Sequence, residues 1–137
     1  MQRLRHGPLV EAAEGAELWL DGGHNPAAGH AIAQTLSELP ARPLVLICGM
    51  LNTKDVGGYL RPLGKVADRL IGVSIPGEAN TLTADETASA AKAEGLAADI
   101  AETLADALRM ATKGTPGARI LICGSLYLAG SVLRENG

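Results

Sequence analysis

The sequence predicts an α/β fold of Rossmann-like type, with a mostly parallel, open sheet and helices on both of its faces. Short apolar strands alternate with helical segments along the whole chain, an order typical of parallel βαβ units. One of these strands, 44–48, is a continuous apolar run, as expected where a parallel strand is covered on both faces, and the strand 119–123 has the same Leu-Ile-Cys ending. Nearly half of the residues are hydrophobic but none is Phe, so the core is expected to be aliphatic.

The first half of the chain is expected to hold three strands and two helices. The expected strands are a short one in residues 1–11, around Leu4 or Leu9, then 16–20 and 44–48, and the expected helices are 26–39 and 56–66. In the first helix Ile32, Leu36 and Leu39 recur at spacings of four and three, which places them on one face. Asp55 is suited to cap the second helix.

The second half continues the alternation. The expected elements are a strand at 69–75, a loop at 76–83, a helix at 84–93, a short strand at 97–100, a helix at about 102–113, a strand at 119–123 and a helix at 126–134. Thr83 and Glu86 have the spacing of a capping box. Gly95 ends the helix that they begin. We therefore expect residues 1–137 to form one domain, since no linker or repeat divides them.

Composition excludes several classes of function. The net charge is −3 and no basic cluster is present, which argues against nucleic acid or an anionic membrane as partner. No apolar run approaches the roughly 20 residues of a membrane span. Cys48 and Cys123 each lie in a Leu-Ile-Cys-Gly strand without a second metal ligand nearby, so we expect no metal site and two reduced, packed thiols. With no secretion signal visible, a cytoplasmic protein is expected.

Residues 18–26, Leu-Trp-Leu-Asp-Gly-Gly-His-Asn-Pro, are the most informative segment. A buried strand runs through a tight turn into a helix, and the turn carries Asp21, His24 and Asn25. Ligands of open α/β sheets bind where a strand ends and a helix begins, and the free amides of the helix favour an anion. This pattern predicts a ligand site.

A structural explanation exists for each residue of this turn. Asn25 is suited to cap the helix. Gly22 and Gly23 are suited to supply positive φ. Asp21 would then accept a hydrogen bond from a loop amide, and His24 would lie at the surface. The residues alone leave both explanations open, although no structural explanation covers the whole set.

Two further candidates follow strands that end in glycine. Lys54 lies between such a strand and a helix, where it is either a point charge for a phosphate or carboxylate or a solvated loop residue. Ser125 lies where a hydroxyl and free helix amides point the same way, a site for a carboxylate or simply an N-cap. The three loops are expected to converge at one edge of the sheet. The chain has no P-loop, dinucleotide fingerprint or nucleophile elbow, so it is not expected to hydrolyse nucleotide by itself.

Three blocks of the sequence resemble one family. They are Asp-Gly-Gly-His-Asn-Pro at 21–26, Cys-Gly-Met-Leu-Asn-Thr-Lys-Asp at 48–55 and Leu-Ile-Cys-Gly-Ser-Leu-Tyr-Leu-Ala-Gly at 121–130. In this order they resemble the C-terminal domain of folylpolyglutamate synthase/dihydrofolate synthase, a branch of the Mur ligase superfamily. The resemblance covers almost the whole chain.

This resemblance implies a ligase that adds L-glutamate to dihydropteroate or a folate through an acyl phosphate, with ATP and Mg²⁺ as cofactors. It implies that Asp21 positions ATP or its metal, or orients the incoming amine, and that His24 contacts glutamate or the transferred phosphoryl group. Lys54 would neutralise an anion, and Asn25 and Ser125 would contact substrate, Ser125 through the glutamate carboxylate. The ATP-binding domain that precedes this domain in the family is absent from the chain, so we expect the chain alone to be inactive.

Three alternatives stay open. The first alternative is the corresponding domain of a cell-wall Mur ligase, with the same chemistry on another substrate. The second is a freestanding binding module for glutamate or a nucleotide, which predicts affinity without any upstream domain. A purely structural domain predicts that Asp21 and His24 tolerate substitution.

Overall fold

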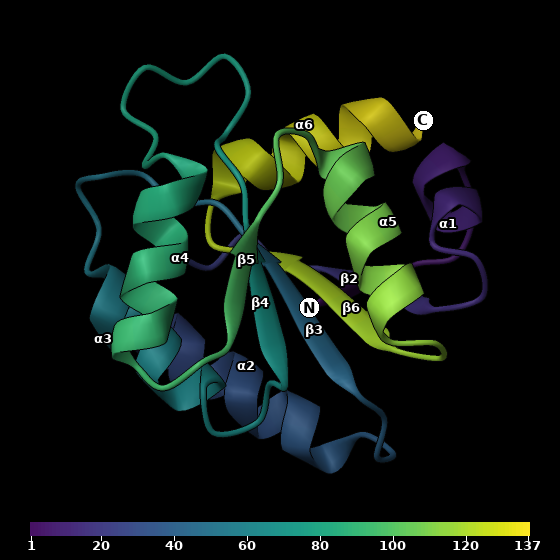
Figure 1. The fold of residues 1–137 in the computed structure, drawn as a ribbon, viewed down its shortest axis with the longest axis horizontal. Helices are drawn as coiled ribbons and strands as arrows, with labels where there is room; N and C mark the ends of the chain where they lie inside the picture. The colour runs from purple at the N-terminus through teal and green to yellow at the C-terminus, as the bar shows by residue number, and fades with distance from the viewer.

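The sheet of this protein has six strands in the order β1-β2-β6-β3-β4-β5, in a computed structural model that describes residues 1–137 (Figure 1). The strands are β1 (Gln2–Leu4), β2 (Glu17–Leu20), β3 (Leu44–Cys48), β4 (Arg69–Gly72), β5 (Ala98–Ile100) and β6 (Arg119–Cys123). β1 pairs with β2 in the antiparallel sense, and every other neighbouring pair is parallel. The predicted mostly parallel sheet is confirmed.

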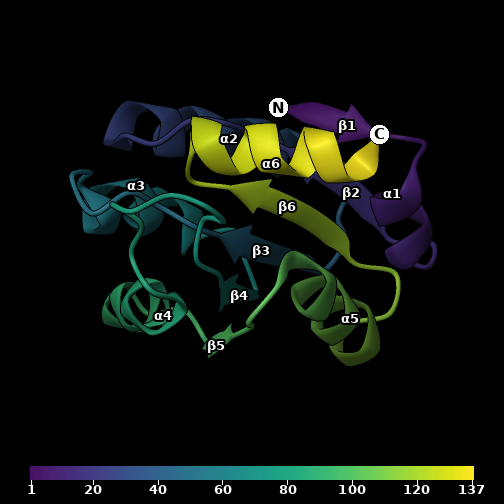
Figure 2. The ribbon, with the colours of Figure 1, turned by 90° about the horizontal axis from the view of Figure 1, so that it is seen from above.

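Six helices cover the two faces of the sheet. They are α1 (Pro8–Ala12), α2 (Pro26–Glu38), α3 (Val56–Leu63), α4 (Ala84–Ala93), α5 (Leu104–Gly114) and α6 (Leu126–Asn136). Figure 2 shows α2, α3 and α4 on one side of the sheet and α1, α5 and α6 on the other. None of the helices has the length and apolar character that a membrane span requires.

Burial on both faces explains why the two central strands, β3 and β6, are apolar apart from Arg119 at the start of β6. In β3, Val45 and Ile47 join the hydrophobic cluster under α1, α5 and α6, whereas Leu46 and Cys48 join the cluster under α2, α3 and α4. Alternate residues of a strand face opposite sides, so a strand covered twice needs apolar residues at every position. Cys48 lies opposite Cys123 of β6, and both are buried free thiols, as predicted.

Several boundaries differ from the sequence-based expectations. The strand expected at 69–75 ends at Gly72, where the pairing with β5 also ends at Ile100. The helix expected at 56–66 ends at Leu63. The short helix α1 was not expected: it has five residues, begins at Pro8 and buries Leu9, whereas the first strand lies around Leu4.

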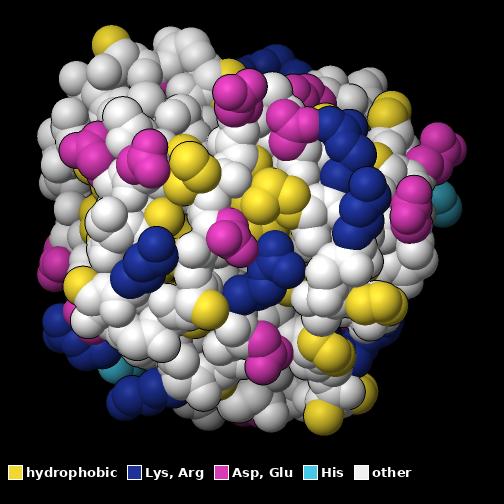
Figure 3. Space-filling model, viewed as in Figure 1, with side chains coloured by type: hydrophobic (Ala, Val, Ile, Leu, Met, Phe, Trp, Pro, Cys, Tyr) yellow, Lys and Arg dark blue, Asp and Glu magenta, His cyan; other side chains and the backbone are white.

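The sheet edge at β5 faces solvent and carries charge. Asp99, at the middle of this short strand, has a side chain that is 62% exposed and lies 3.8 Å from Arg69. Figure 3 shows acidic and basic side chains interspersed with hydrophobic ones over the face that carries α4, β5 and α5. Short, charged edge strands resist pairing with other chains.

A buried ion cluster fastens the amino ends of β2 and β6. Arg119 Nε and Trp19 Nε1 donate to Glu17 Oε1 over 2.9 and 3.0 Å, and Arg42 Nη1 pairs with Oε2. Burial raises the pKa of the Glu17 carboxyl, but the hydrogen bonds from Arg119, Trp19 and Arg42 outweigh burial and lower it from 4.5 to about 2. The lowered pKa therefore keeps the carboxylate ionised beside the positive charges of Arg119 and Arg42.

Candidate functional site

Three loops converge at the carboxyl edge of the sheet, as the sequence predicts. β2, β6 and β3 are parallel neighbours, so they end side by side, and each is followed by a helix. The backbone continues the pairing past the strand ends, because Asp21 N donates to Ile122 O over 3.0 Å and Gly49 N donates to Cys123 O over 3.2 Å. The amino ends of α2, α6 and α3 therefore open onto one edge, which favours an anionic ligand.

Glycines allow the close approach of these loops. A Cβ on Gly124 would lie 2.6 Å from the carbonyl oxygen of Gly49, and Gly124 has a φ of 110°. A Cβ on Gly22 would lie 2.6 Å from Leu126 Cδ2, and one on Gly23 would lie 2.7 Å from Ala28 Cβ. The prediction that Gly22 and Gly23 supply positive φ is wrong, since neither has a positive φ. Crowding, rather than backbone conformation, disfavours a side chain at Gly23, whereas at Gly22 the contact is with the end of the flexible Leu126 side chain.

Asn25, Asp55 and Ser125 cap the three helices. Asn25 Oδ1 accepts from Ala28 N over 2.8 Å, and Asp55 Oδ1 accepts from Gly58 N over 3.0 Å. Ser125 Oγ accepts from the amides of Tyr127 and Leu128, and Ser125 is only 2% exposed. The capping explanations are therefore confirmed for all three residues. Because both Ser125 contacts use the oxygen as an acceptor, its hydroxyl hydrogen stays free to donate, and ligand contact remains a prediction.

The turn between β2 and α2 holds Asp21 and His24, both half-buried. Asp21 Oδ1 accepts from Gly23 N over 2.7 Å, the loop-amide bond of the structural explanation, and Oδ2 lies 2.9 Å from the amino group of Met1. His24 Nδ1 is closed to solvent and has no hydrogen-bond partner. Buried polar atoms without partners are rare, so His24 keeps unused hydrogen-bonding capacity at this edge.

Lys54 lies in the loop that joins β3 to α3 and is half-buried. None of the ion pairs of the structure includes it. The start of α3 lies against the start of α2, because a Cβ on Gly58 would be 2.8 Å from Pro26 Cγ. The structure thus brings the Lys54 loop to the same edge as the Asp21 turn, with its positive charge unpaired.

Tyr59 is a buried polar residue to which sequence reasoning gave no role. It is fully buried on α3, and its hydroxyl has no hydrogen-bond partner. Burial, together with the nearby thiols of Cys123 and Cys48, raises its pKa well above the ordinary value, so the phenol stays protonated. The signal in the sequence was weak: a tyrosine on an apolar helix face that leads into Leu60 and Leu63.

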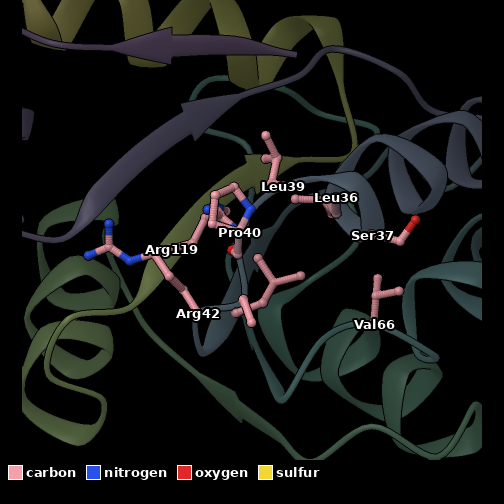
Figure 4. Close-up of a pocket in the computed structure, with 9 residues that line it drawn as sticks. Leu36, Ser37, Leu39, Pro40, Arg42, Val66 and Arg119 are labelled. Atoms are coloured by element: carbon pink, nitrogen blue, oxygen red, sulfur yellow. The ribbon is translucent and has the colours of Figure 1, made fainter.

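The predicted site residues line none of the four hollows of the surface. One hollow, of about 260 Å³, lies at the opposite, amino end of the strands, with Arg42 and Arg119 at one end and Ser37 and Val66 at the other (Figure 4). Both arginines already pair with Glu17. A second hollow, of about 340 Å³, lies between the end of β4 and helices α5 and α6. The candidate site is therefore an open edge, not an enclosed pocket.

These features define an α/β domain in which the carboxyl edge of the sheet favours an anionic ligand and is open rather than enclosed. A family model described as Mur ligase, glutamate ligase domain, matches residues 4–126. The chain therefore belongs to the family of Mur ligase C-terminal domains, as the sequence resemblance implied.

Relatives in the same family are folate enzymes. The chain is 36% identical over 116 residues to dihydrofolate synthase/folylpolyglutamate synthase of Mycobacterium tuberculosis, a match that covers 82% of this chain and 22% of the relative. It is 31% identical over 113 residues to folylpolyglutamate synthase of Lacticaseibacillus casei, covering 82% of this chain and 25% of that protein.

The fold is also that of a solved relative. Folylpolyglutamate synthase of M. tuberculosis in complex with ADP superposes with a TM-score of 0.81 at 29% identity, over 97% of this chain and 31% of that chain. The chain thus spans about a quarter of the length of the curated relatives that it matches. It is homologous to the C-terminal domain of folylpolyglutamate synthase.

Proposed function

We propose that residues 1–137 act as one domain, the glutamate-ligase domain of an ATP-dependent enzyme that joins L-glutamate to dihydropteroate or a folate. The observation that supports this most is the convergence of three helix amino ends at one open edge, together with His24, whose Nδ1 has no hydrogen-bond partner, and Lys54, which joins no ion pair. Family membership gives the reaction class, and ADP is bound by the M. tuberculosis relative. An ATP-binding domain that faces this edge completes the site.

In this proposal the chain positions reactants and neutralises charge. Asp21 positions ATP or its metal, or orients the amine of glutamate, and His24 contacts glutamate or the transferred phosphoryl group. Lys54 neutralises an anion. Ser125 donates its free hydroxyl hydrogen to the glutamate carboxylate, and Asn25 contacts substrate beside it. Orienting an amine against an activated carbonyl and stabilising developing phosphate charge are the contributions such a site can make.

The cofactors of this proposal are ATP and Mg²⁺. The chain has no group of three or more His, Cys, Asp or Glu side chains able to hold a metal ion. Mg²⁺ usually takes one or two protein carboxylates together with nucleotide phosphates. Asp21 therefore fits as one carboxylate towards Mg²⁺, and the remaining ligands come from the nucleotide and the ATP-binding domain. We place the enzyme in the cytoplasm, where free thiols such as Cys48 and Cys123 stay reduced.

The test is an ADP-release assay on a hybrid in which residues 1–137 replace the matching C-terminal part of the M. tuberculosis relative. ATP, dihydropteroate or tetrahydrofolate, and a panel of amino acids are supplied. We expect ADP release to require both a pterin acid and L-glutamate. Asp21→Ala and His24→Ala should each lower kcat by roughly 10²-fold, the usual size for a lost electrostatic or acid–base contact.

Glu11→Ala and His6→Ala are matched controls, because both residues are exposed and lie on or just before α1, at the opposite, amino end of β2. Their turnover should equal that of the unsubstituted hybrid, with the same denaturation midpoint. Full turnover in the Asp21 and His24 variants would contradict the residue roles. Release with another acid or amino acid would keep the superfamily and discard the folate substrate, as for a cell-wall ligase. An inactive hybrid, with ADP or glutamate binding by the isolated chain, would favour the binding module.

A further inference from the structure

The connection between β4 and α4, residues 73–83, is long for a loop between a strand and a helix. Connections of this type usually have roughly 2–6 residues, and longer ones are commonly functional. Figure 1 shows it as the teal loop that rises above α4. It crosses to the β3–α3 loop, which carries Lys54.

The two loops are joined by backbone hydrogen bonds. Asn52 N donates to Asn80 O over 2.8 Å, and Leu82 N donates to Met50 O over 2.9 Å. Between these bonds Leu51 and Thr81 form an isolated antiparallel bridge. The longer loop therefore holds the residues just before Lys54 from one side, as a short strand pair would.

The hydroxyl of Thr81 closes the longer loop on itself. Thr81 Oγ1 accepts from Ile75 N over 2.9 Å and donates to Leu82 O over 2.8 Å. One side chain thus ties the beginning of the loop to the end that pairs with Met50. Without this hydroxyl the Ile75 amide loses its partner, and the loop ends lose the link that holds them together.

The turn before Lys54 starts at the bridged residue. Lys54 N donates to Leu51 O over 3.3 Å, so the lysine ends a tight turn that begins at Leu51. We propose that Thr81 is a positioning residue, which fixes the Lys54 loop against the carboxyl edge so that the lysine charge meets an anionic ligand in a set place. The ligand half of this inference rests on the proposed function.

The structural half is tested by amide hydrogen exchange in the 137-residue chain. We expect Thr81→Val, which keeps the shape but removes the hydroxyl, to speed exchange at Asn52 and Leu82 about tenfold, in line with a lost hydrogen bond. Thr81→Ser should restore slow exchange. Thr35→Val is the matched control, because Thr35 lies on the exposed face of α2 and its Oγ1 donates only to Ala31 O. Unchanged exchange at Asn52 and Leu82 in Thr81→Val would overturn the proposal.

The ligand half is tested by calorimetric titration of ADP into the hybrid enzyme that carries Thr81→Val, Lys54→Ala or both substitutions. If Thr81 acts through Lys54, Thr81→Val weakens ADP binding several-fold when Lys54 is present and has no further effect in Lys54→Ala. Equal weakening in both backgrounds would overturn the positioning role. If Lys54→Ala leaves ADP binding unchanged, the proposed ligand role fails, whereas faster exchange at Asn52 still supports the fixation of the loop.

Discussion

Substitution of Glu17 by Gln should destabilise the domain in a strongly pH-dependent way. The carboxylate is 13% exposed and accepts hydrogen bonds from Arg119, Arg42 and Trp19. Arg119 is itself only 5% exposed, so the variant leaves a buried guanidinium without its counter-charge. Breaking one side of a buried ion pair is costly because the remaining charge stays desolvated.

The magnitude follows from the pKa of Glu17. A carboxyl whose pKa falls from 4.5 in the unfolded chain to about 2 in the folded one favours folding when it is ionised. That difference is worth about 3 kcal/mol above pH 4.5. Because the folded pKa is the lower one, the contribution is lost as the pH falls from about 4.5 to about 2, and about 1 kcal/mol remains at pH 3.

The assay is urea denaturation of both proteins at pH 7 and pH 3. We expect Glu17→Gln to lower the free energy of unfolding by about 3 kcal/mol at pH 7 and by about 1 kcal/mol at pH 3. Glu11→Gln, at an exposed position on α1, should leave it unchanged at both values. A Glu17→Gln penalty of the same size at both pH values would refute the reasoning, because it would not come from the charge.

Two further predictions concern backbone crowding and the thiols. Gly124→Ala places a Cβ 2.6 Å from the Gly49 carbonyl oxygen at a φ of 110° and should cost more than about 2 kcal/mol in urea denaturation, whereas Gly77→Ala, with a φ of 74° but open space around it, should cost about 1 kcal/mol. Contact with Cys123, together with burial, raises the pKa of the Cys48 thiol, so Ellman's reagent should label neither cysteine at pH 8 until the chain is unfolded; labelling at the rate of an exposed thiol would contradict this packing.

The fold was largely predictable because the apolar sequences of the central strands indicate that these strands are buried. β3 is apolar at every position and β6 at every position after Arg119, and the three strands that end at the candidate site lead into well-capped helices. The limits of β4 were not predictable, because they depend on how far β5 pairs with it. The short helix α1 was missed for a related reason: its five residues have no helical periodicity, and tertiary contacts decide it, such as Leu9 N donating to Asn136 Oδ1.

The location of the candidate site was predictable from the sequence, whereas the roles of its individual residues were less so. Parallel pairing brings the Asp21, Lys54 and Ser125 loops to one edge, and it follows from βαβ units, whereas the strand order that makes β2, β6 and β3 neighbours was not predicted. Whether a residue such as Gly22 acts through its φ or through its contact with Leu126 depends on the spatial distance between residues that lie far apart in the sequence. The role of Thr81 has the same origin, because its partners become visible only when two loops meet.

β2 has only four residues, and different forces hold its two ends. The Glu17 ion cluster holds the amino end through buried charges, whereas Asp21 follows the carboxyl end and lies among loops and helix termini. A protein engineer can therefore vary these ends separately. Changes around Glu17 should alter the free energy of unfolding without altering the edge where ligands are expected. One short strand thus carries a determinant of stability at one end and the candidate site at the other.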